Sequence, residues 1–143
     1  MLRKQLNIDM ENLFQGLVSS LLPGEICQHF AMASVTEKAH GVEIRMEEYS
    51  TLVPSELSGN PSVVLDGFCN PLELLHYSLK GKPLYLKLYR RRWKVSGEIT
   101  HYSNRYDLHP PGVKATHEFA SFLKGEVRCT SDEYVRFLLD TKS

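Results

Sequence analysis

The segment from Lys82 to Leu108 constrains the fold more than any other part of the chain. It contains two runs rich in Tyr, Leu, Ile, Thr and Trp, which flank the pair Ser96-Gly97. Aromatic and β-branched residues favour strands, and a small pair that includes glycine is typical of a two-residue hairpin loop. The segment is therefore predicted to form a β-hairpin in which Val95 and Glu98 flank the loop.

The register of this hairpin follows from the loop, because side chains alternate between the faces of a strand and pair across the ladder. One predicted face is aromatic and carries Tyr85, Lys87, Tyr89, Arg91 and Trp93 opposite Leu108, Tyr106, Asn104, Tyr102 and Thr100. The other predicted face carries Leu84, Leu86, Leu88, Arg90, Arg92 and Lys94 opposite Asp107, Arg105, Ser103, His101 and Ile99. The pattern leaves open which face is buried.

Charge is distributed unevenly along the chain. The formal net charge is zero, with 17 basic and 17 acidic residues. Residues 80–105 nevertheless hold eight of the basic residues and one acidic residue, Glu98. A basic ribbon interleaved with aromatic residues attracts phosphates and can stack on bases. The predicted nucleic-acid-binding residues are Lys87, Arg90, Arg91, Arg92, Trp93, Lys94 and Arg105.

The same residues also have a structural interpretation. Large aromatic side chains are usually buried, so the tyrosines and Trp93 would form the core face of the sheet. The arginines would then be solvated or paired with acidic residues elsewhere in the chain. Trp93 accordingly has two alternative roles, which are stacking on bases and pinning the hairpin to the core.

Length and composition indicate one soluble globular domain: the chain has 143 residues, of which 42% are hydrophobic and 24% charged. Cys27, Cys69 and Cys129 are far apart and form no C-x-x-C pair, which argues against a disulfide framework and a cysteine-based zinc site. No apolar run approaches the roughly 20 residues of a membrane span, and the N-terminus lacks a secretory signal pattern. A cytoplasmic location and no membrane segment are therefore expected.

The remaining elements are predicted from periodicity and turn residues. Apolar spacing predicts a helix from Asp9 to residue 21, and Pro23 is expected in the first turn of a short second helix. Strands are predicted over residues 30–36, 42–48 and 63–65, and residues 72–79 favour a strand over a helix. Thr116 and the capping box Thr130–Glu133 predict two C-terminal helices. The second of these ends at Leu139 and presents a stripe of Tyr134, Val135, Leu138 and Leu139.

Together these elements predict an α+β fold. It is expected to contain an antiparallel sheet of about five strands in two hairpins, an N-terminal helix and two C-terminal helices. Residues 1–143 are expected to form a single domain, with a helical lead-in over 1–30, the sheet over 30–108 and the C-terminal helices over 109–143.

The sequence contains no pattern that indicates catalysis or a bound cofactor. It has no P-loop, dinucleotide-binding or nucleophile-elbow motif, and its cysteines have no histidine at a convincing spacing. His101, His109 and His117 recur every eight residues, but this run crosses a strand, a Pro-Pro loop and a helix start and has no metal-ligand geometry. The chain is therefore expected not to be an enzyme and to hold no metal or cofactor.

Several motifs resemble the N-terminal region of bacterial insertion-sequence transposases, in a group whose N-terminal region can be encoded apart from the catalytic part. The group has an R-R-R-W strand and an E-F-A-A-F-L-K helix. The matching features here are Leu21-Leu22-Pro23 with a short helix and Phe30, then Gly81-Lys82, the strand Tyr85–Trp93 and the helix Thr116–Lys124, THEFASFLK. The resemblance covers roughly residues 17–125.

Two parts of the chain depart from the group's pattern. Where the group has a K-G-T-R-like segment, this chain has Pro111–Thr116 and lacks one basic residue. The tail over residues 126–143 matches no part of the pattern. The resemblance implies a transposition-associated protein without catalytic activity, because the metal-binding acidic triad of such transposases belongs to a separate, larger domain.

Three hypotheses follow. In the leading one, the chain is a non-catalytic transposase N-terminal protein that binds transposon-end DNA through the basic aromatic hairpin, chiefly at phosphates. In the first alternative it is a protein–protein interaction module that docks on a catalytic transposase subunit or another acidic partner, with the 134–139 stripe serving that partner or a homodimer. In the second alternative it binds single-stranded nucleic acid and stacks bases on Tyr85, Tyr89, Trp93 and Tyr102.

Overall fold

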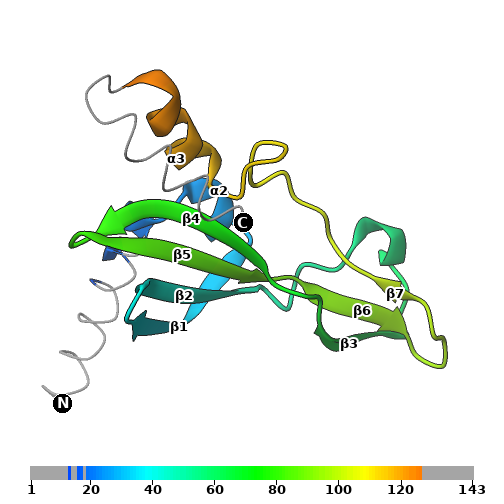
Figure 1. Ribbon diagram of the computed structural model, residues 1–143. Coiled ribbons are helices and arrows are strands. Elements are labelled where there is room, and N and C mark those ends of the chain that lie inside the picture. Colours follow the sequence, from blue (N-terminus) through cyan, green and yellow to red (C-terminus); the bar gives the residue numbers. More distant parts are fainter. Residues whose placement is uncertain (1–12, 14–15, 18, 127–143) are drawn as a thin grey trace, which may run out of the picture.

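The computed structural model describes residues 13, 16–17 and 19–126 (Figure 1). The described residues between 13 and 21 are helical, as the apolar spacing predicts, and Pro23 precedes the short helix α2, Gly24–Cys27. The helix predicted from Thr130 to Leu139 lies outside the described residues.

The described strands form two sheets, which we call the large sheet and the small sheet. The large sheet has the order β1-β2-β5-β4, with β1 at Phe30–Lys38, β2 at Gly41–Glu48, β5 at Lys82–Tyr89 and β4 at Leu72–Leu79. The small sheet has the order β3-β6-β7, with β3 at Val63–Phe68, β6 at Arg91–Val95 and β7 at His101–Tyr102. The α+β class is confirmed, but two sheets replace the single sheet of about five strands, and β2 pairs with β5 in parallel.

Local turn chemistry explains the hairpin of β4 and β5. Lys80 and Gly81 connect the two strands with φ angles of 52° and 75°. A two-residue type I′ turn needs positive φ at both central positions, and glycine adopts such angles without steric cost. The strand predicted over residues 72–79 is therefore confirmed, and so is the turn that follows it.

The main core lies on one face of the large sheet. Alternate residues of β2 and β5 point to this face, and the α2 region, Phe30 and Leu108 cover them. The buried strand residues are Val42, Ile44, Met46, Leu84, Leu86 and Leu88. Helix α3, His117–Ser121, packs Phe119 and Ala120 with Leu75 in a second cluster on the other side of β4. A π-helical turn, η2 (Phe122–Glu126), follows α3.

The N-terminus of α3 is capped as predicted. The Thr116 hydroxyl accepts a hydrogen bond of 3.2 Å from the Phe119 N–H. Thr116 is itself buried, and its own N–H donates to the Leu75 carbonyl at 3.0 Å. The cap therefore also fixes the start of α3 to the edge of β4.

The pairing predicted for residues 85–90 with residues 103–108 is wrong. Both edges of β5 are occupied, one by β2 and the other by β4, so β5 has no free edge. The strand breaks at Arg90, and β6 continues from it into the small sheet (Figure 1). Before the break the buried residues have even numbers, such as Leu88, and after it the buried residue is the odd-numbered Trp93. The prediction treated residues 84–95 as one unbroken strand, so its assignment of side chains to faces is wrong across this break.

The loop end of the predicted hairpin does form, with a different register. The chain turns at Ser96-Gly97, where a backbone hydrogen bond of 2.9 Å closes the turn. Strands β6 and β7 pair Trp93 with Tyr102 and Lys94 with His101, two positions beyond the predicted partners. A shift of two positions keeps each side chain on its face, so the predicted grouping of these four residues is confirmed.

Candidate nucleic-acid interface

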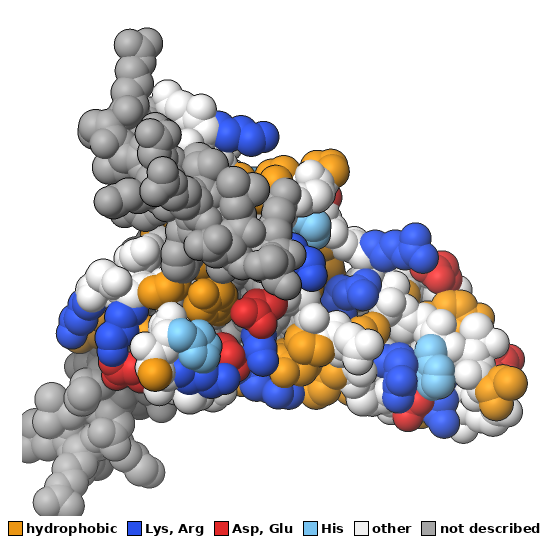
Figure 2. All heavy atoms as spheres, viewed as in Figure 1, with side chains coloured by type: hydrophobic (Ala, Val, Ile, Leu, Met, Phe, Trp, Pro, Cys, Tyr) orange, Lys and Arg blue, Asp and Glu red, His pale blue; other side chains and the backbone are white. Residues whose placement is uncertain are grey.

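The small sheet extends from the large sheet as a narrow arm. Figure 1 shows β5 running into β6, so that β3, β6 and β7 lie at the opposite end of the molecule from the β1–β2 and β4–β5 turns. Figure 2 shows basic side chains and a histidine on this arm, with acidic side chains beside them. The arm carries Arg92 and Lys94, which belong to the predicted nucleic-acid-binding set.

One face of the arm, formed by Asp66, Arg92, Lys94 and His101, is called the arm face below. Arg92 and Lys94 alternate onto the same side of β6, and Lys94 lies opposite His101. His101 Nε2 lies 2.5 Å from the Asp66 carboxylate, and Arg92 Nη2 lies 3.7 Å from it. Arg92 Nε also donates to the Asp66 carbonyl oxygen at 2.8 Å. These contacts hold the Arg92 side chain in a defined position.

The charge of the arm face is positive. The hydrogen bond with His101, assisted by the charges of Lys94 and Arg92, holds the pKa of the Asp66 carboxyl below its ordinary value. Asp66 is therefore ionised at neutral pH and offsets one positive charge. Arg92 and Lys94 contribute two, so the face keeps a net positive charge without counting His101.

Arg90 and Arg105 meet at a pocket beside the arm, which we call the two-arginine pocket. Its volume is about 310 Å³, and it is lined by Phe30, Leu72, Leu88, Arg90, Arg105, Tyr106 and Leu108. No carboxylate is among these lining residues. The sequence prediction also placed Arg90 and Arg105 on one face, although it did so through a strand pairing that does not exist.

The two guanidinium groups of this pocket differ in their contacts. Arg90 Nη1 donates a hydrogen bond of 2.9 Å to the Asn104 carbonyl oxygen. Arg105 is exposed and makes no hydrogen bond or ion pair with any residue that the structure describes. Guanidinium groups recognise phosphate and carboxylate through paired N–H donors. Two of them above an apolar floor therefore suit an anionic group attached to an apolar or aromatic body.

Two of the predicted site residues lie away from the arm face. Lys87 is on the outer face of the large sheet, where its amino group is 3.5 Å from the Glu43 carboxylate. Arg91 donates through its N–H to Glu48 Oε1 at 2.8 Å and through Nε to the Glu48 carbonyl at 2.6 Å. Its guanidinium also lies 4.9 Å from the centre of the Phe68 ring. These contacts hold the Arg91 side chain against β2 and β3.

Trp93 lies in the interior of the small sheet. It is 5% exposed and pairs with Leu65 on β3 and Tyr102 on β7. Its indole Nε1 is buried and has no hydrogen-bond partner within the described part of the chain. A ring with so little exposure offers no open face to a base.

Sequence reasoning missed the importance of Glu48, which is fully buried. Its carboxylate accepts hydrogen bonds from the Arg91 N–H, from Asn104 Nδ2 at 3.1 Å and from the Tyr106 hydroxyl. The available signal is its phase, because Glu48 follows Met46 by two residues and so falls on the apolar face of β2. Burial, together with the hydrogen bond to Glu48, raises the pKa of Tyr106.

Arg45 of β2, Tyr89 of β5 and Phe68 of β3 form a cluster where the large sheet meets the small sheet. The Arg45 guanidinium lies 3.8 Å from the centre of the Tyr89 ring and 5.7 Å from that of Phe68. The Phe68 and Tyr89 rings meet edge to face at 5.9 Å. Tyr89, one of the residues predicted to stack on bases in the single-strand hypothesis, therefore already carries a stacked cation.

The chain was compared with protein-family models, with curated proteins and with solved structures. No protein-family model matches the chain, and neither the curated proteins nor the solved structures contain a significant match. Within the described residues, no three His, Cys, Asp or Glu side chains are grouped so as to hold a metal ion. No helix in the same part of the chain has the length and apolar character needed to cross a bilayer.

Proposed function

We propose that the protein is the non-catalytic DNA-binding component of a transposition system, as the motif resemblance implies, and that it contacts DNA through the arm face and the two-arginine pocket. The observation that carries this proposal is the meeting of Arg90 and Arg105 at a pocket whose lining contains no carboxylate. The charge of the arm face adds to it, because Arg92 follows Arg90 by two residues. In this proposal catalysis belongs to a separate transposase subunit.

The shape of the arm supports contact with duplex DNA. Paired strands lie about 4.8 Å apart, and the major groove of B-DNA, about 12 Å wide, admits a two-stranded ribbon. The β6–β7 hairpin is such a ribbon, and it carries Lys94 and His101 side by side on one face. The hairpin would enter the groove while the two-arginine pocket holds a backbone phosphate.

The expected salt dependence follows from the number of available cations. Arg90 and Arg105 of the two-arginine pocket and Arg92 and Lys94 of the arm face supply four positive charges. Each neutralised phosphate contributes about −0.9 to the slope of log affinity against log salt, so four contacts give a slope of about −3.6. This value is shallower than the full predicted basic set would give, because Lys87 and Arg91 are held elsewhere.

The test is a titration of the intact protein with duplex DNA at several salt concentrations between 50 and 300 mM. The double variant Arg90→Ala/Arg105→Ala removes the pocket cations, and Lys38→Ala/Lys87→Ala removes the same charge from the large sheet. We expect the pocket variant to lose about two units of slope and at least tenfold in affinity, and the control to change less than threefold. Circular dichroism establishes that each variant is folded.

Two results would contradict this proposal. If the wild-type protein does not bind duplex DNA at 50 mM salt, the arm does not bind nucleic acid. That result would favour the alternative in which the arm docks on an acidic protein partner. Equal losses in the two double variants would show that only overall charge matters. Because Arg90 also bonds to Asn104, the single variant Arg105→Glu gives a second measurement that removes no internal contact.

The single-strand alternative is separated by comparing oligo-dT with duplex DNA of equal length. The buried position of Trp93 and the contact of Tyr89 with Arg45 leave few open aromatic faces. We therefore expect duplex DNA to bind more tightly than oligo-dT. Tighter binding of oligo-dT would transfer the proposal to single-stranded nucleic acid, with a base entering the two-arginine pocket.

A further inference from the structure

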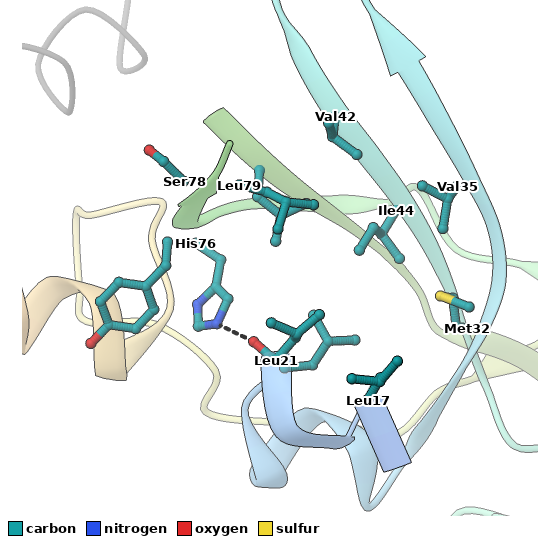
Figure 3. A pocket seen from close by; sticks show the side chains of 12 residues that line it. Leu17, Leu21, Met32, Val35, Val42, Ile44, His76, Ser78 and Leu79 are labelled. Carbon is teal, nitrogen blue, oxygen red and sulfur yellow. Dashed lines mark hydrogen bonds between the residues drawn. The ribbon is translucent and has the colours of Figure 1, made fainter. Parts of the chain in front are cut away.

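The core face of the large sheet contains a second hollow, which we call the apolar groove. It has a volume of about 270 Å³ and lies between the described helical residues of the N-terminal segment and the strands near the β1–β2 and β4–β5 turns. Figure 3 shows Leu17 and Leu21 on its helical side, facing Val35 and Ile44 on the strands. Its lining is almost wholly apolar. His76 and Tyr77 are its two titratable residues.

The groove is an uncovered continuation of the main core. Val42 and Ile44 belong to both the core and the groove. Four other lining residues are large and apolar yet solvent-exposed: Leu17 is 61% exposed, Leu21 53%, Val35 52% and Leu79 37%. Contiguous exposed apolar surface of this kind marks an interaction site, because covering it removes apolar area from water.

The sequence supplies a segment that needs such a site. The capping box Thr130–Glu133 predicts a helix whose apolar side chains pair at a spacing of four, Tyr134 with Leu138 and Val135 with Leu139. A helix with one apolar stripe gains most of its stability by burying that stripe. An amphipathic helix in an apolar groove is a common mode of recognition.

The last described turn of the chain, η2, contacts one residue that lines the groove. The Phe122 ring lies 5.2 Å from the ring of Tyr77, which lines the groove, and the described residues end at Glu126. Eight residue-to-residue steps lead from Glu126 to Tyr134 and span about 26 Å when the chain is extended, at about 3.3 Å per step. A helix of ten residues is about 15 Å long. The same chain is therefore long enough to bring its stripe to the groove.

We propose that the apolar groove is the docking site of residues 130–139 of the same chain. A short connection gives an attached segment an effective concentration in the millimolar range, so at micromolar protein the chain's own segment outcompetes the same segment of a second copy. In this arrangement the C-terminal stripe covers Leu17, Leu21 and Val35. The inference does not depend on DNA binding.

The test is hydrogen–deuterium exchange with mass spectrometry on the intact protein. Val35→Asp places a charge in the groove at an exposed edge-strand position. Val64→Asp, at a residue 40% exposed on the small sheet, is the matched control. We expect peptides covering residues 134–139 to exchange at least tenfold more slowly than a free peptide in the wild type and in Val64→Asp. They should exchange at nearly the free rate in Val35→Asp.

A reciprocal variant keeps the inference falsifiable if Val35→Asp disturbs the sheet. Leu138→Asp alters the segment and leaves the groove unchanged, and it is expected to release residues 134–139 while β4 and β5 stay protected. The inference is overturned if these residues exchange at the free rate in the wild type, or if Leu138→Asp leaves their protection unchanged. It is also overturned if protection rises with protein concentration between 1 and 100 µM, which would identify a second copy as the occupant.

Discussion

Glu48, at the end of β2, accepts a hydrogen bond of 2.8 Å from the backbone N–H of Arg91, at the start of β6. The Arg91 side chain donates in return to the Glu48 carbonyl oxygen at 2.6 Å. The two residues are 43 positions apart in sequence, and their contact lies where the large sheet meets the small sheet. The position of the basic arm relative to the large sheet therefore depends on a buried carboxylate.

Replacing Glu48 with glutamine should destabilise the protein strongly. The carboxylate serves three donors, on Arg91, Asn104 and Tyr106, and an amide cannot accept from all of them in the same geometry. A loss of about 3 kcal/mol in the free energy of unfolding is expected, because buried donors are left unpaired. Urea denaturation measures it, and Glu47→Gln is the control, with an expected loss below about 1 kcal/mol for a surface ion pair. Equal losses in the two variants would contradict the role of the Glu48 network.

Stability should fall as the pH drops from about 7 to 5, because of His76. His76 Nε2 lies 3.0 Å from the Leu21 carbonyl, which only accepts, and Nδ1 lies 2.8 Å from the Thr116 hydroxyl. Burial lowers the pKa of His76 below its ordinary value of 6.5. The folded state therefore binds the proton less tightly than the unfolded state. The contribution of neutral His76 is complete above the unfolded pKa and is lost as the pH falls toward the folded pKa.

The measurement is urea denaturation of the wild type and His76→Gln at several pH values in this window. A single group changes the free energy of unfolding by at most about 1.4 kcal/mol per pH unit. We expect the free energy of unfolding of the wild type to fall with much of this slope. The variant should be less stable at pH 7, and its free energy of unfolding should change little with pH. The same slope in both proteins would assign the pH dependence to other groups. The carboxyl groups whose pKa is lowered, such as that of Asp66, lose their contribution at lower pH.

Gly41→Ala should destabilise the large sheet by about 2 kcal/mol. A Cβ atom at Gly41 would lie 2.7 Å from the Pro83 carbonyl oxygen and 2.9 Å from the Tyr85 ring. The backbone oxygen cannot move aside easily, because β5 is paired on both edges. Gly24→Ala is the matched control, since its Cβ would meet nothing within 4 Å and alanine is favoured in a helix. Thermal or urea unfolding distinguishes the two, and a neutral Gly41→Ala would show that β2 and β5 can separate locally.

Trp93→Phe should cost only about 1 kcal/mol of stability, whereas Trp93→Ala should cost about 3–5 kcal/mol. Phenylalanine keeps most of the buried ring and removes the indole N–H, which has no partner among the described residues. Under the proposed function, Trp93→Phe should also bind duplex DNA within about twofold of the wild type, because the ring is buried. A large loss of DNA affinity in a stable Trp93→Phe protein would show instead that the indole contacts DNA.

The candidate interface was predicted in part. Alternation along β6 placed Arg92 and Lys94 on one face, and the structure keeps them there with His101. Alternation placed Arg91 and Lys87 on the opposite face, and they entered the predicted binding set through their charge; the structure gives them Glu48 and Glu43 as partners. Side chains on one strand share a face for geometric reasons, but an ion pair with a distant residue is not encoded in that alternation.

The sequence by itself determined the elements whose signals are local. Pro23 immediately precedes α2, Lys80-Gly81 makes the β4–β5 turn, Thr116 caps α3, and the alternation from Val42 to Met46 defines the buried face of β2. Hydrogen bonds and allowed φ angles within a few residues decide these features, so neighbouring residues suffice to predict them.

Only the tertiary structure decided how the strands pair and where the long basic segment divides. Strand β5 pairs with β2 and β4, although β6 continues the same run of residues in another sheet. Pairing depends on which edges are free and on how much apolar surface the whole arrangement buries, and these are properties of residues far apart in sequence. For that reason the break at Arg90 and the hydrogen-bond partners of Glu48 appear only when the chain is assembled.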